Sequence, residues 1–590
     1  PSRKRVSPAE SCVQRTDEHA QLQESREALL HEVLDKELGG LNEEAWNHLR
    51  SSVRWTQLSA GETLFREGDE ADSMYVVVSG RLRATRQEDG QTRIVGEITR
   101  GETVGEMALL TGGKRSATVE AMRDCVLVGL DSPAFGQLAR VCPESVMHVA
   151  RVQFDRIQRA NRPRSADRLR LSVAILAADP SCDAKSFAQR LEQEIGRRGK
   201  TVLAESANAP VAAGTEADRK ARLAIWLNEL EASAQILLMP CGGTDEIWTR
   251  QCLRSADLVL ILSRAGQIPS VREHDIPRGV KRMLVMLHPD GAKPPSGTAQ
   301  ARAACEATAH FHLRENSSAD FSRLARLLTG RAVGISFAGG GARSFCHLGV
   351  MRALHEHGIP LDIATGTSLG AIIASGIGLD LGLEDLMGRF RVMVKTNPTK
   401  GDYLLIPKSS LLSGRKLDRL LPHLLPDTDI EDCWKDFACV SANITNPGAH
   451  IHREGKLLRA LRATVSIPGV FPPVATAEGE LLVDGGVVNN LPADVARDAG
   501  AGRLIACDQG GSSGGKGKAD KPNAMGVIMR SVILHSRISG RAWKTAADLY
   551  FESPVSDISL LEWDQFDLAV KRGYDNAKKV LEGVDPSGWQ

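Results

Sequence analysis

Ser368 lies between Gly366 and Gly370, after the apolar run 361–364 and before the apolar run 371–374. A strand before the serine and a helix after it would place its Oγ on a strained turn above a sheet. Glycines two residues before and two residues after the serine relieve the crowding of such a turn. The spacing therefore predicts that Ser368 is the nucleophile of an elbow in which Gly366 and Gly370 are the flanking glycines.

A glycine-rich turn precedes this elbow by one predicted strand–helix unit. It follows the β-type run 332–337 and comes before apolar residues at helical spacing over 345–354. The free N–H groups of such a turn converge on negative charge, so a phosphate or an oxyanion would fit there. Close packing of strand against helix needs the same residues and is the structural alternative. The turn consists of Gly339, Gly340, Gly341, Ala342 and Arg343.

A serine nucleophile needs a proton acceptor, and the sequence offers a carboxylate. Asp484 ends the apolar run 481–483 and is followed by Gly485 and Gly486. A turn-forming aspartate is the alternative interpretation. No histidine of this region stands in a recognisable motif, so these side chains are expected to be solvated or packed: His347, His355, His357, His450 and His452. No metal ligand set is expected either.

The composition limits which kinds of protein this chain can be. At 590 residues it is long enough for about three to four domains. Its 42% hydrophobic and 25% charged residues exclude collagen-like and wholly disordered proteins. The 74 Lys and Arg nearly cancel the 73 Asp and Glu, so no global field favours nucleic acid. The 11 Cys form no CxxC pair, which indicates reduced thiols in the cytoplasm.

The pattern of elements divides the chain into four parts. Residues 1–40 carry helical spacing at 24–38 and are expected to be an N-terminal helical arm. From residue 41, short apolar runs between glycines predict a small all-β barrel, with trailing helices up to residue 165. Strand-like and helical stretches alternate over 166–330, which predicts a linking α/β domain. The last part, 331–590, is a second α/β domain that contains Ser368 and Asp484.

In combination, the glycine turn, the serine elbow and the Asp-Gly-Gly motif resemble the patatin-like phospholipases. The segment 320–330 and the domain order resemble the neuropathy target esterase group of that family. The resemblance implies a Ser368–Asp484 dyad and an oxyanion hole made by backbone N–H groups of residues 339–343. One departure is Ser344, which stands where the family's glycine motif ends in glycine.

A second resemblance lies in the β-rich part. The segment from Gly105 and Glu106 to Arg115, Ser116 and Ala117 resembles the phosphate-binding cassette of cyclic nucleotide-binding domains. Arg115 would pair with the cyclic phosphate and Glu106 would accept the ribose hydroxyl. The resemblance implies cAMP or cGMP as a regulatory ligand, with a docking module that has an empty pocket as the alternative.

Together these patterns predict a multidomain fold: an all-β cyclic nucleotide-binding barrel with flanking helices, a central α/β domain and a C-terminal α/β patatin-like hydrolase domain. The predicted activity is hydrolysis of lysophospholipid or phospholipid carboxylic esters, without a required cofactor. A cyclic-nucleotide-responsive interaction or scaffold protein with a weak or inactive hydrolase domain is the alternative. The sequence does not determine an oligomeric state.

A lipid substrate also predicts contact with a membrane. No apolar run reaches the 18 residues or so that span a bilayer, so a peripheral attachment of a cytoplasmic protein is expected. Two segments, 389–394 and 403–407, are the candidates for the lipid-contacting surface, with burial in the core as the alternative for each.

Overall fold

A computed structural model of the chain describes most of its length. The described residues are 31, 34, 40–88, 91–145, 147–149, 151, 170–210, 216–242, 245–271, 276–277, 279–406, 409–510 and 540–590. The N-terminal arm expected at 1–40 and the end of the trailing helices expected up to residue 165 lie largely outside them.

The chain folds into two compact units. The first comprises Pro1–Leu262, Pro269–Met283 and Cys305–Thr308. The second comprises Ser263–Ile268, Leu284–Ala304 and Ala309–Gln590. The four-part division of the chain at residues 40, 165 and 330 stays a prediction.

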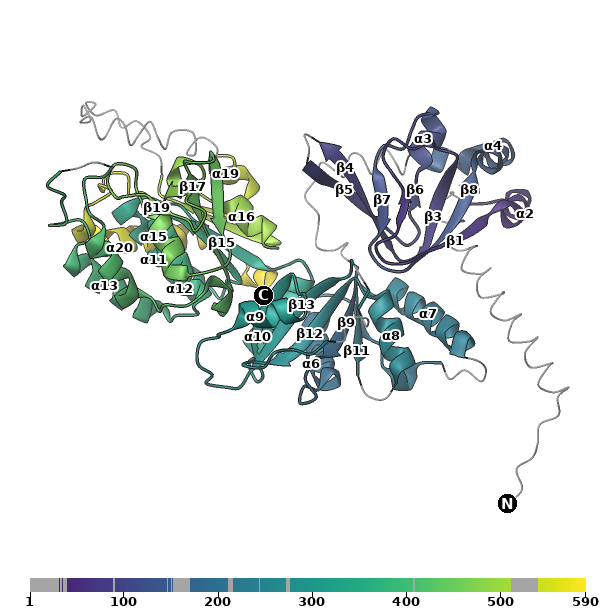
Figure 1. Ribbon diagram of the computed structural model, residues 1–590, viewed down its shortest axis with the longest axis horizontal. Coiled ribbons are helices and arrows are strands. Elements are labelled where there is room, and N and C mark those ends of the chain that lie inside the picture. Colours follow the sequence, from purple (N-terminus) through teal and green to yellow (C-terminus); the bar gives the residue numbers. More distant parts are fainter. Residues whose placement is uncertain are drawn as a thin grey trace, which may run out of the picture. The chain divides into compact units, whose positions relative to one another are not determined.

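The first unit contains the predicted all-β barrel, which is built from two antiparallel sheets (Figure 1). Their strand orders are β1-β8-β3-β6 and β2-β7-β4-β5. Apolar side chains of both sheets, among them Val77, Leu82 and Leu127, fill the space between them. The strands are β1 (Arg54–Leu58), β2 (Thr63–Phe65), β3 (Ser73–Ser79), β4 (Arg81–Glu88), β5 (Gln91–Thr99), β6 (Thr103–Val104), β7 (Thr118–Ala121) and β8 (Cys125–Asp131).

Helices flank this barrel, as expected. Alternate side chains of strand β3 point to opposite faces of its sheet, and both faces are buried. Met74 and Val76 face a cluster that includes Leu49 of α2 and Leu138 of α4. The helices of this part are α2 (Glu43–Ser52), α3 (Glu106–Thr111) and α4 (Ser132–Val141).

The central part is the predicted α/β domain with parallel strands. Its sheet has the order β10-β11-β9-β12-β13-β14, and β9 pairs in parallel with β11 and β12. The strands are β9 (Leu171–Ala177), β10 (Thr201–Leu203), β11 (Ile236–Cys241), β12 (Leu258–Arg264), β13 (Lys281–His288) and β14 (Ala309–Arg314). The helices are α6 (Ala184–Gly196), η2 (Ser206–Asn208), α7 (Glu216–Ser233), α8 (Glu246–Ser255), α9 (Thr298–Ala304) and α10 (Ser318–Leu328).

An 8-stranded sheet organises the C-terminal part of the second unit. Its order is β19-β20-β17-β16-β15-β21-β22, and β18 pairs with β17. Strands β15, β16 and β21 run parallel, so their carboxyl ends lie at one edge. The strands are β15 (Val333–Phe337), β16 (Ile363–Thr367), β17 (Asp436–Asn443), β18 (Gly448–His452), β19 (Val474–Ala475), β20 (Leu481–Asp484), β21 (Arg503–Asp508) and β22 (Leu549–Glu552).

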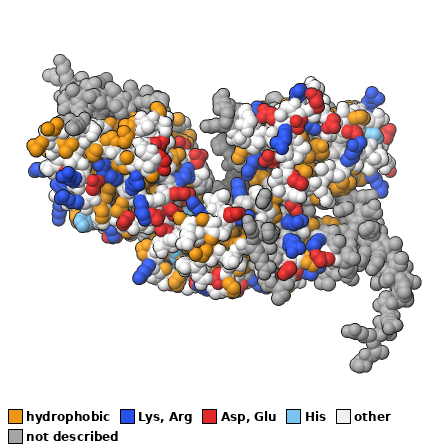
Figure 2. All heavy atoms as spheres, viewed as in Figure 1, with side chains coloured by type: hydrophobic (Ala, Val, Ile, Leu, Met, Phe, Trp, Pro, Cys, Tyr) orange, Lys and Arg blue, Asp and Glu red, His pale blue; other side chains and the backbone are white. Residues whose placement is uncertain are grey.

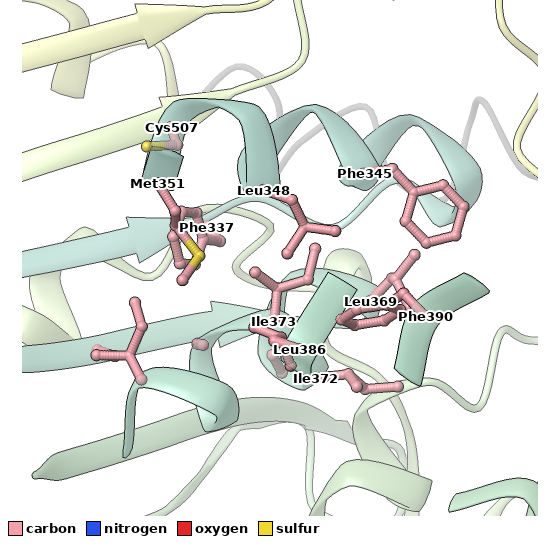
Figure 3. Packing of buried hydrophobic residues seen from close by; sticks show 14 of the residues in the cluster. Phe337, Phe345, Leu348, Met351, Leu369, Ile372, Ile373, Leu386, Phe390 and Cys507 are labelled. Carbon is pink, nitrogen blue, oxygen red and sulfur yellow. The ribbon is translucent and has the colours of Figure 1, made fainter. Parts of the chain in front are cut away.

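Helices cover both faces of this sheet. Neighbouring residues of one strand point to opposite faces, and they pack into different hydrophobic clusters. Ala364 packs with the large cluster beneath α11 and α12, whereas Ile363 packs with Ala493 and Ala496 of α16. Figure 3 shows the large cluster, in which Phe345 and Phe390 lie with their ring centroids 5.8 Å apart. The α-helices are α11 (Cys346–Glu356), α12 (Leu369–Gly378), α13 (Leu383–Thr396), α14 (Arg415–Leu424), α15 (Leu457–Thr464), α16 (Ala493–Asp498), α19 (Trp543–Ala546) and α20 (Phe566–Leu581). The 3-10 helices are η3 (Gly341–Phe345), η4 (Ile430–Asp432), η5 (Gly485–Val487), η6 (Trp563–Gln565) and η7 (Pro586–Trp589).

Two further findings bear on the expectations from composition. No helix in the described ranges is long and apolar enough to cross a membrane. The cysteines that the structure describes are free and buried.

Candidate active site

Ser368 occupies the turn between β16 and α12, where the sequence predicts a nucleophile. Its backbone has φ 55° and ψ −132°, a positive-φ conformation that is rare and costly for a residue with a side chain. An added Cβ at Gly366 would lie 2.6 Å from the backbone nitrogen of Ala371, and one at Gly370 would lie 2.6 Å from the carbonyl oxygen of Phe337. Both flanking glycines are therefore sterically required by the turn.

Asp484 ends β20 and lies against Ser368. The hydroxyl of Ser368 donates a hydrogen bond to the carboxylate, and the N–H of Gly486 donates to Oδ1 at 2.8 Å. Burial raises the pKa of Asp484 to about 6, although both hydrogen bonds favour the charged form. Position 485 requires a glycine, because an added Cβ would lie 2.1 Å from the carbonyl oxygen of Val440.

The glycine turn lies beside the serine, since a Cβ added to Gly339 would lie 3.0 Å from that of Ser368. Three of its five N–H groups are already bonded. Gly339 donates to the carbonyl of Asn490 at 3.1 Å, and Ala342 donates to that of Leu560 at 2.8 Å. Arg343 donates to the carbonyl of Gly340 at 3.2 Å.

The N–H groups of Gly340 and Gly341 have no acceptor among the described residues. Gly341 has φ 55°, and a Cβ there would lie 2.1 Å from the carbonyl oxygen of Leu560. These two amides are thus the members of the predicted 339–343 set that remain available to an oxyanion. The assignment of the oxyanion hole itself stays a prediction.

A buried glutamine, which the sequence interpretation missed, forms hydrogen bonds with residues at both ends of the turn. Gln509 Nε2 lies 2.8 Å from the carbonyl oxygen of Ala338 and 2.7 Å from Ser344 Oγ. A Cβ on Gly340 would lie 1.5 Å from Gln509 Oε1. Ser344, the departure from the family pattern, therefore accepts a hydrogen bond at this site. A polar residue directly after the apolar strand β21 was the available signal for Gln509.

A second set of missed residues holds the backbone of the dyad. The N–H of Ser368 donates to Thr464 Oγ1 at 3.0 Å, and the N–H of Asp484 donates to the carbonyl of Ser466 at 2.9 Å. Thr464 is the last residue of α15, and its hydroxyl donates in turn to the carbonyl of Val440. Residues at and just after the end of α15 therefore contact both members of the dyad. No local sequence pattern predicts these contacts.

The histidines do not join the dyad. In the described part of the chain, none of them hydrogen bonds to Ser368 or Asp484. His452 Nε2 lies 2.9 Å from Ser441 Oγ, and burial lowers its pKa to about 3. His347 Nε2 lies 3.0 Å from the carbonyl oxygen of Ala338, and burial lowers its pKa to about 4. The geometry is therefore that of a serine–carboxylate pair rather than a Ser-His-Asp triad.

In the barrel, the predicted cassette brings Arg115 and Glu106 together as buried residues. The Arg115 guanidinium donates to the carbonyl of Gly105 at 3.0 Å and stacks 4.1 Å from the centre of the Phe65 ring. Burial lowers the pKa of Arg115. Its Nε is buried and has no hydrogen-bond partner among the described residues, so the site fits an incoming anion. Of the remaining cassette residues, Ser116 is exposed and Ala117 is buried.

Three protein families match this chain. Residues 335–497 match the patatin-like phospholipases, which places the glycine turn, the elbow and Asp484 in that family's domain. Residues 55–141 match the cyclic nucleotide-binding domain. Residues 170–318 match the P-loop like domain of the neuropathy target esterase family. The second unit therefore carries a patatin-like phospholipase domain.

Curated relatives share more than one of these domains. Patatin-like phospholipase domain-containing protein 7 of Mus musculus is 31% identical over 517 residues, which cover 78% of this chain and 38% of the relative. Lysophospholipase NTE1 of Mycosarcoma maydis is 26% identical over 650 residues, 92% of this chain and 34% of the relative. Together with the three family matches, they show that the chain belongs to the neuropathy target esterase group of patatin-like phospholipases.

The extent of these similarities has a limit. The chain spans about 38% of the length of the mouse relative. Among solved structures, the regulatory domain of Toxoplasma gondii PKA with cAMP is 28% identical and covers 23% of this chain and 51% of its own. Its TM-score of 0.20 is too low to support an argument.

Proposed function

We propose that the chain is a serine esterase that hydrolyses carboxylic esters of lysophospholipids or phospholipids through an acyl-enzyme. The observation that carries the proposal is the hydrogen bond between Ser368, held at positive φ, and the buried carboxylate of Asp484. The N–H groups of Gly340 and Gly341 lie in the adjoining turn and supply the donors that an oxyanion needs.

The first half of the reaction acylates the serine. Ser368 Oγ attacks the ester carbonyl carbon while its proton passes to Asp484. The amides of Gly340 and Gly341 donate to the oxyanion, and one such donor is worth roughly 3–4 kcal/mol in comparable sites. When the tetrahedral intermediate collapses, the proton moves from Asp484 to the departing alcohol oxygen. The acyl group then remains on Ser368.

The second half releases the fatty acid. A water molecule attacks the acyl carbon and gives its proton to Asp484, which returns it to Ser368 Oγ as the acid departs. A pKa of about 6 makes Asp484 a stronger base than an ordinary aspartate, because a carboxylate that holds its proton more tightly also accepts one more readily. The mechanism uses no metal and no cofactor.

The choice of a lipid ester rests on the family. The patatin-like match and the printed name of the fungal relative, a lysophospholipase, support a lysophospholipid or phospholipid substrate. Such molecules reside in or leave from membranes, so we propose that the enzyme meets them at a membrane surface as a peripheral protein in the cytoplasm.

The test is hydrolysis of lysophosphatidylcholine by purified variants. Ser368→Ala removes the nucleophile and Asp484→Asn removes the proton acceptor, so each should release almost no fatty acid while melting near the wild-type temperature. His450→Gln is the matched control and should keep most of the activity, because His450 is outside the proton path. Turnover by Ser368→Ala above a few per cent of wild type would refute the dyad.

The scaffold interpretation of the same chain makes a different prediction. A weak or inactive hydrolase domain would not react with a fluorophosphonate, whereas an activated Ser368 should be labelled covalently. Labelling of wild type and its loss in Ser368→Ala would exclude the scaffold alternative. An unlabelled wild-type protein would favour it.

For the barrel we infer a regulatory role, with cAMP or cGMP as the ligand. The observation in its favour is Arg115, whose buried Nε has no partner among the residues described and which lies near Glu106. A ligand changes catalysis only if it binds two states of the enzyme unequally. Calorimetric titration of wild type and Arg115→Ala with both nucleotides tests occupancy, and we expect less than about tenfold coupling to activity, or roughly 1.4 kcal/mol. Absence of binding at millimolar nucleotide would leave the barrel a docking module.

A further inference from the structure

An exposed apolar arm extends from the patatin-like domain between α13 and α14. It consists of residues 403–406, and three of its side chains are largely or wholly in solvent: Tyr403 at 73%, Leu405 at 102% and Ile406 at 76% exposed. Leu404 and, on the adjacent segment 410–412, Leu411 are also exposed. Soluble proteins rarely expose so many large apolar side chains in one place, so the arm is a candidate for contact with another surface.

The other predicted lipid-contacting segment behaves differently. Residues 389–394 form part of α13, and Phe390 and Met393 are buried in the large cluster of the sheet. Its largest apolar side chains are therefore part of the core, with Val392 as its exposed apolar residue. Of the predicted 403–407 segment, residue 407 lies outside the described residues. The exposure in the structure thus selects the 403–406 arm.

The arm is held in place by backbone contacts. Tyr403 forms a β-bridge with Leu412, and the N–H of Leu404 donates to the carbonyl of Leu411 at 3.0 Å. At its start, the N–H of Ser413 donates to the carbonyl of Asp402 at 2.8 Å. These bonds fix the backbone of residues 402–404, from which Leu405 and Ile406 continue into solvent.

The segment 411–412 beside the arm is bonded to residues that lie close in the chain to the supports of the dyad. The N–H groups of Leu411 and Leu412 donate to the carbonyls of Gly469 and Val470, each at 2.9 Å. That segment follows Thr464 and Ser466, which bind the backbone N–H groups of Ser368 and Asp484. The arm therefore lies next to the segment that supports the catalytic pair.

Basic residues flank the arm in the chain. Lys395 and Lys400 precede it, and Arg415 and Arg419 follow it, all with exposed side chains. No described acidic side chain forms an ion pair with any of the four. The nearby acids have partners of their own, since Asp402 accepts from Ser413 Oγ at 2.5 Å and Asp418 pairs with Arg462 at 2.6 Å.

The figures agree with this arrangement. Figure 1 shows the green segment after α13 at the left margin of the picture. Figure 2 shows hydrophobic side chains at that margin, together with lysines and arginines. An apolar tip with a basic fringe is the combination that binds anionic lipid surfaces, since the tip enters the acyl boundary while the cations meet the head groups.

We propose that residues 403–406 are a docking element that inserts into an anionic phospholipid surface beside the mouth of the active site. The inference rests on the proposed function, because it makes the arm the route by which a lipid ester reaches Ser368. The tip supplies the apolar contact, and the four flanking cations supply the preference for anionic lipid.

The experiment is co-sedimentation of the full chain with phosphatidylcholine vesicles, with and without phosphatidylglycerol. The double variant Leu405→Ser/Ile406→Ser should lower the partition coefficient about tenfold, because it removes apolar surface that only the membrane would bury. Ile444→Ser is the matched control, as Ile444 is 51% exposed elsewhere in the same unit, and should bind as wild type does. Lys400→Glu/Arg415→Glu should weaken only the phosphatidylglycerol-dependent part.

Two substrates separate this inference from the proposed function. The double variant should hydrolyse a water-soluble ester such as p-nitrophenyl butyrate at the wild-type rate and lose only the hydrolysis of vesicle-borne lysophosphatidylcholine. Ser368→Ala should lose both activities and still sediment with vesicles. If wild type hydrolyses neither ester, the proposed function fails, while the sedimentation result still decides the docking element.

The docking element would be overturned if the double variant sediments like wild type or loses no more binding than Ile444→Ser does. If that variant also becomes monomeric where wild type is dimeric by size exclusion, the arm is instead a contact between two copies of the chain.

Discussion

The turn after β15 and the turn after β9 both connect a buried parallel strand to a helix start, but different groups occupy the two starts. After β9, the carboxylate of Asp183 accepts from the N–H groups of Lys185 at 3.0 Å and Ser186 at 3.1 Å. Hydrogen bonds from the Ser186 side chain and backbone hold the pKa of Asp183 below its ordinary value. The first turn of α6 therefore already binds a negative charge, and that charge belongs to the protein.

After β15 the same position is occupied by glycines. Gly340 and Gly341 bring no side chain to the helix start, and among the described residues their N–H groups have no acceptor. The lysine after the other turn is also engaged, because Lys185 Nζ lies 3.0 Å from Glu205 Oε2. One topology thus yields a closed, self-capped helix start in the P-loop like domain and an open one in the patatin-like domain.

A helix start can bind an external anion only where the protein supplies no acceptor of its own for the N–H groups there. An incoming phosphate at α6 would meet the carboxylate of Asp183 and would have to displace it. An oxyanion at the glycine turn would meet the N–H groups of Gly340 and Gly341, which have no acceptor among the described residues. The carboxylates of the two regions also differ in pKa. Hydrogen bonds lower the pKa of Asp183 and so stabilise its charged form, whereas burial raises the pKa of Asp484 and makes it more basic.

The largest expected effect comes from filling the open turn. In Gly340→Ala the new Cβ would lie 1.5 Å from Gln509 Oε1, so either the turn or the buried Gln509 amide that bonds it must shift. Either shift changes the position of the Gly340 and Gly341 amides relative to Ser368. We expect roughly a 10²-fold or greater fall in kcat on a soluble ester, the cost of losing an oxyanion donor. Gly388→Ala on α13 meets no atom within 4 Å and is the control. Equal activities of the two variants would show that the turn is not catalytic.

An effect of intermediate size is expected from acid, because hydrolysis depends on the protonation state of Asp484. The dyad needs Asp484 unprotonated, and its pKa is raised to about 6, so activity should be full above that pH and fall below it. On a soluble ester, kcat/KM should drop about tenfold per pH unit on the acidic side. An Asp484 with an ordinary aspartate pKa would instead remain active down to about pH 4. A flat profile between about pH 5 and about pH 8 would contradict the raised pKa.

The smallest effect should follow from opening the closed turn. Asp183→Ala removes the cap of α6 and should cost about 1 kcal/mol of unfolding free energy, measured by denaturant titration. Asp183→Asn keeps an acceptor and should cost less. Ester hydrolysis should not change in either variant, since Asp183 belongs to the first unit and the dyad to the second. Wild-type binding of ATP at micromolar concentration would contradict the self-capped interpretation.

Local patterns were sufficient for much of this molecule. The elbow of Ser368 was predictable because its strand, its turn and its helix all lie within a few neighbouring residues. The barrel was predictable for the same reason, since glycine turns and short apolar runs alternate along one stretch of chain. The alternation of strand-like and helical stretches expected over 166–330 is confirmed by strands such as β9, β11 and β12 and by helices α6, α7 and α8.

Other features depend on residues that are distant in the chain. Five residues of the glycine turn were equivalent candidates by sequence, and Leu560 and Asn490 distinguish them by occupying the N–H groups of Ala342 and Gly339. Gln509 and Thr464 carry no motif because a side-chain amide or hydroxyl becomes specific only through its neighbours. The 389–394 and 403–407 segments were likewise indistinguishable until packing buried Phe390 and left Leu405 in solvent.

Local stretches of the chain are enough to predict the chemical groups of the site, namely the serine on its turn, the aspartate at a strand end and the glycines between strand and helix. These groups depend on backbone conformation, which short stretches of chain encode through glycine and apolar spacing. The folded structure was needed to show which amides remain open, that burial raises the pKa of Asp484, and which apolar segment faces solvent. Hydrogen-bond partners, desolvation and exposure are properties of contacts between distant segments, and a linear pattern does not contain them.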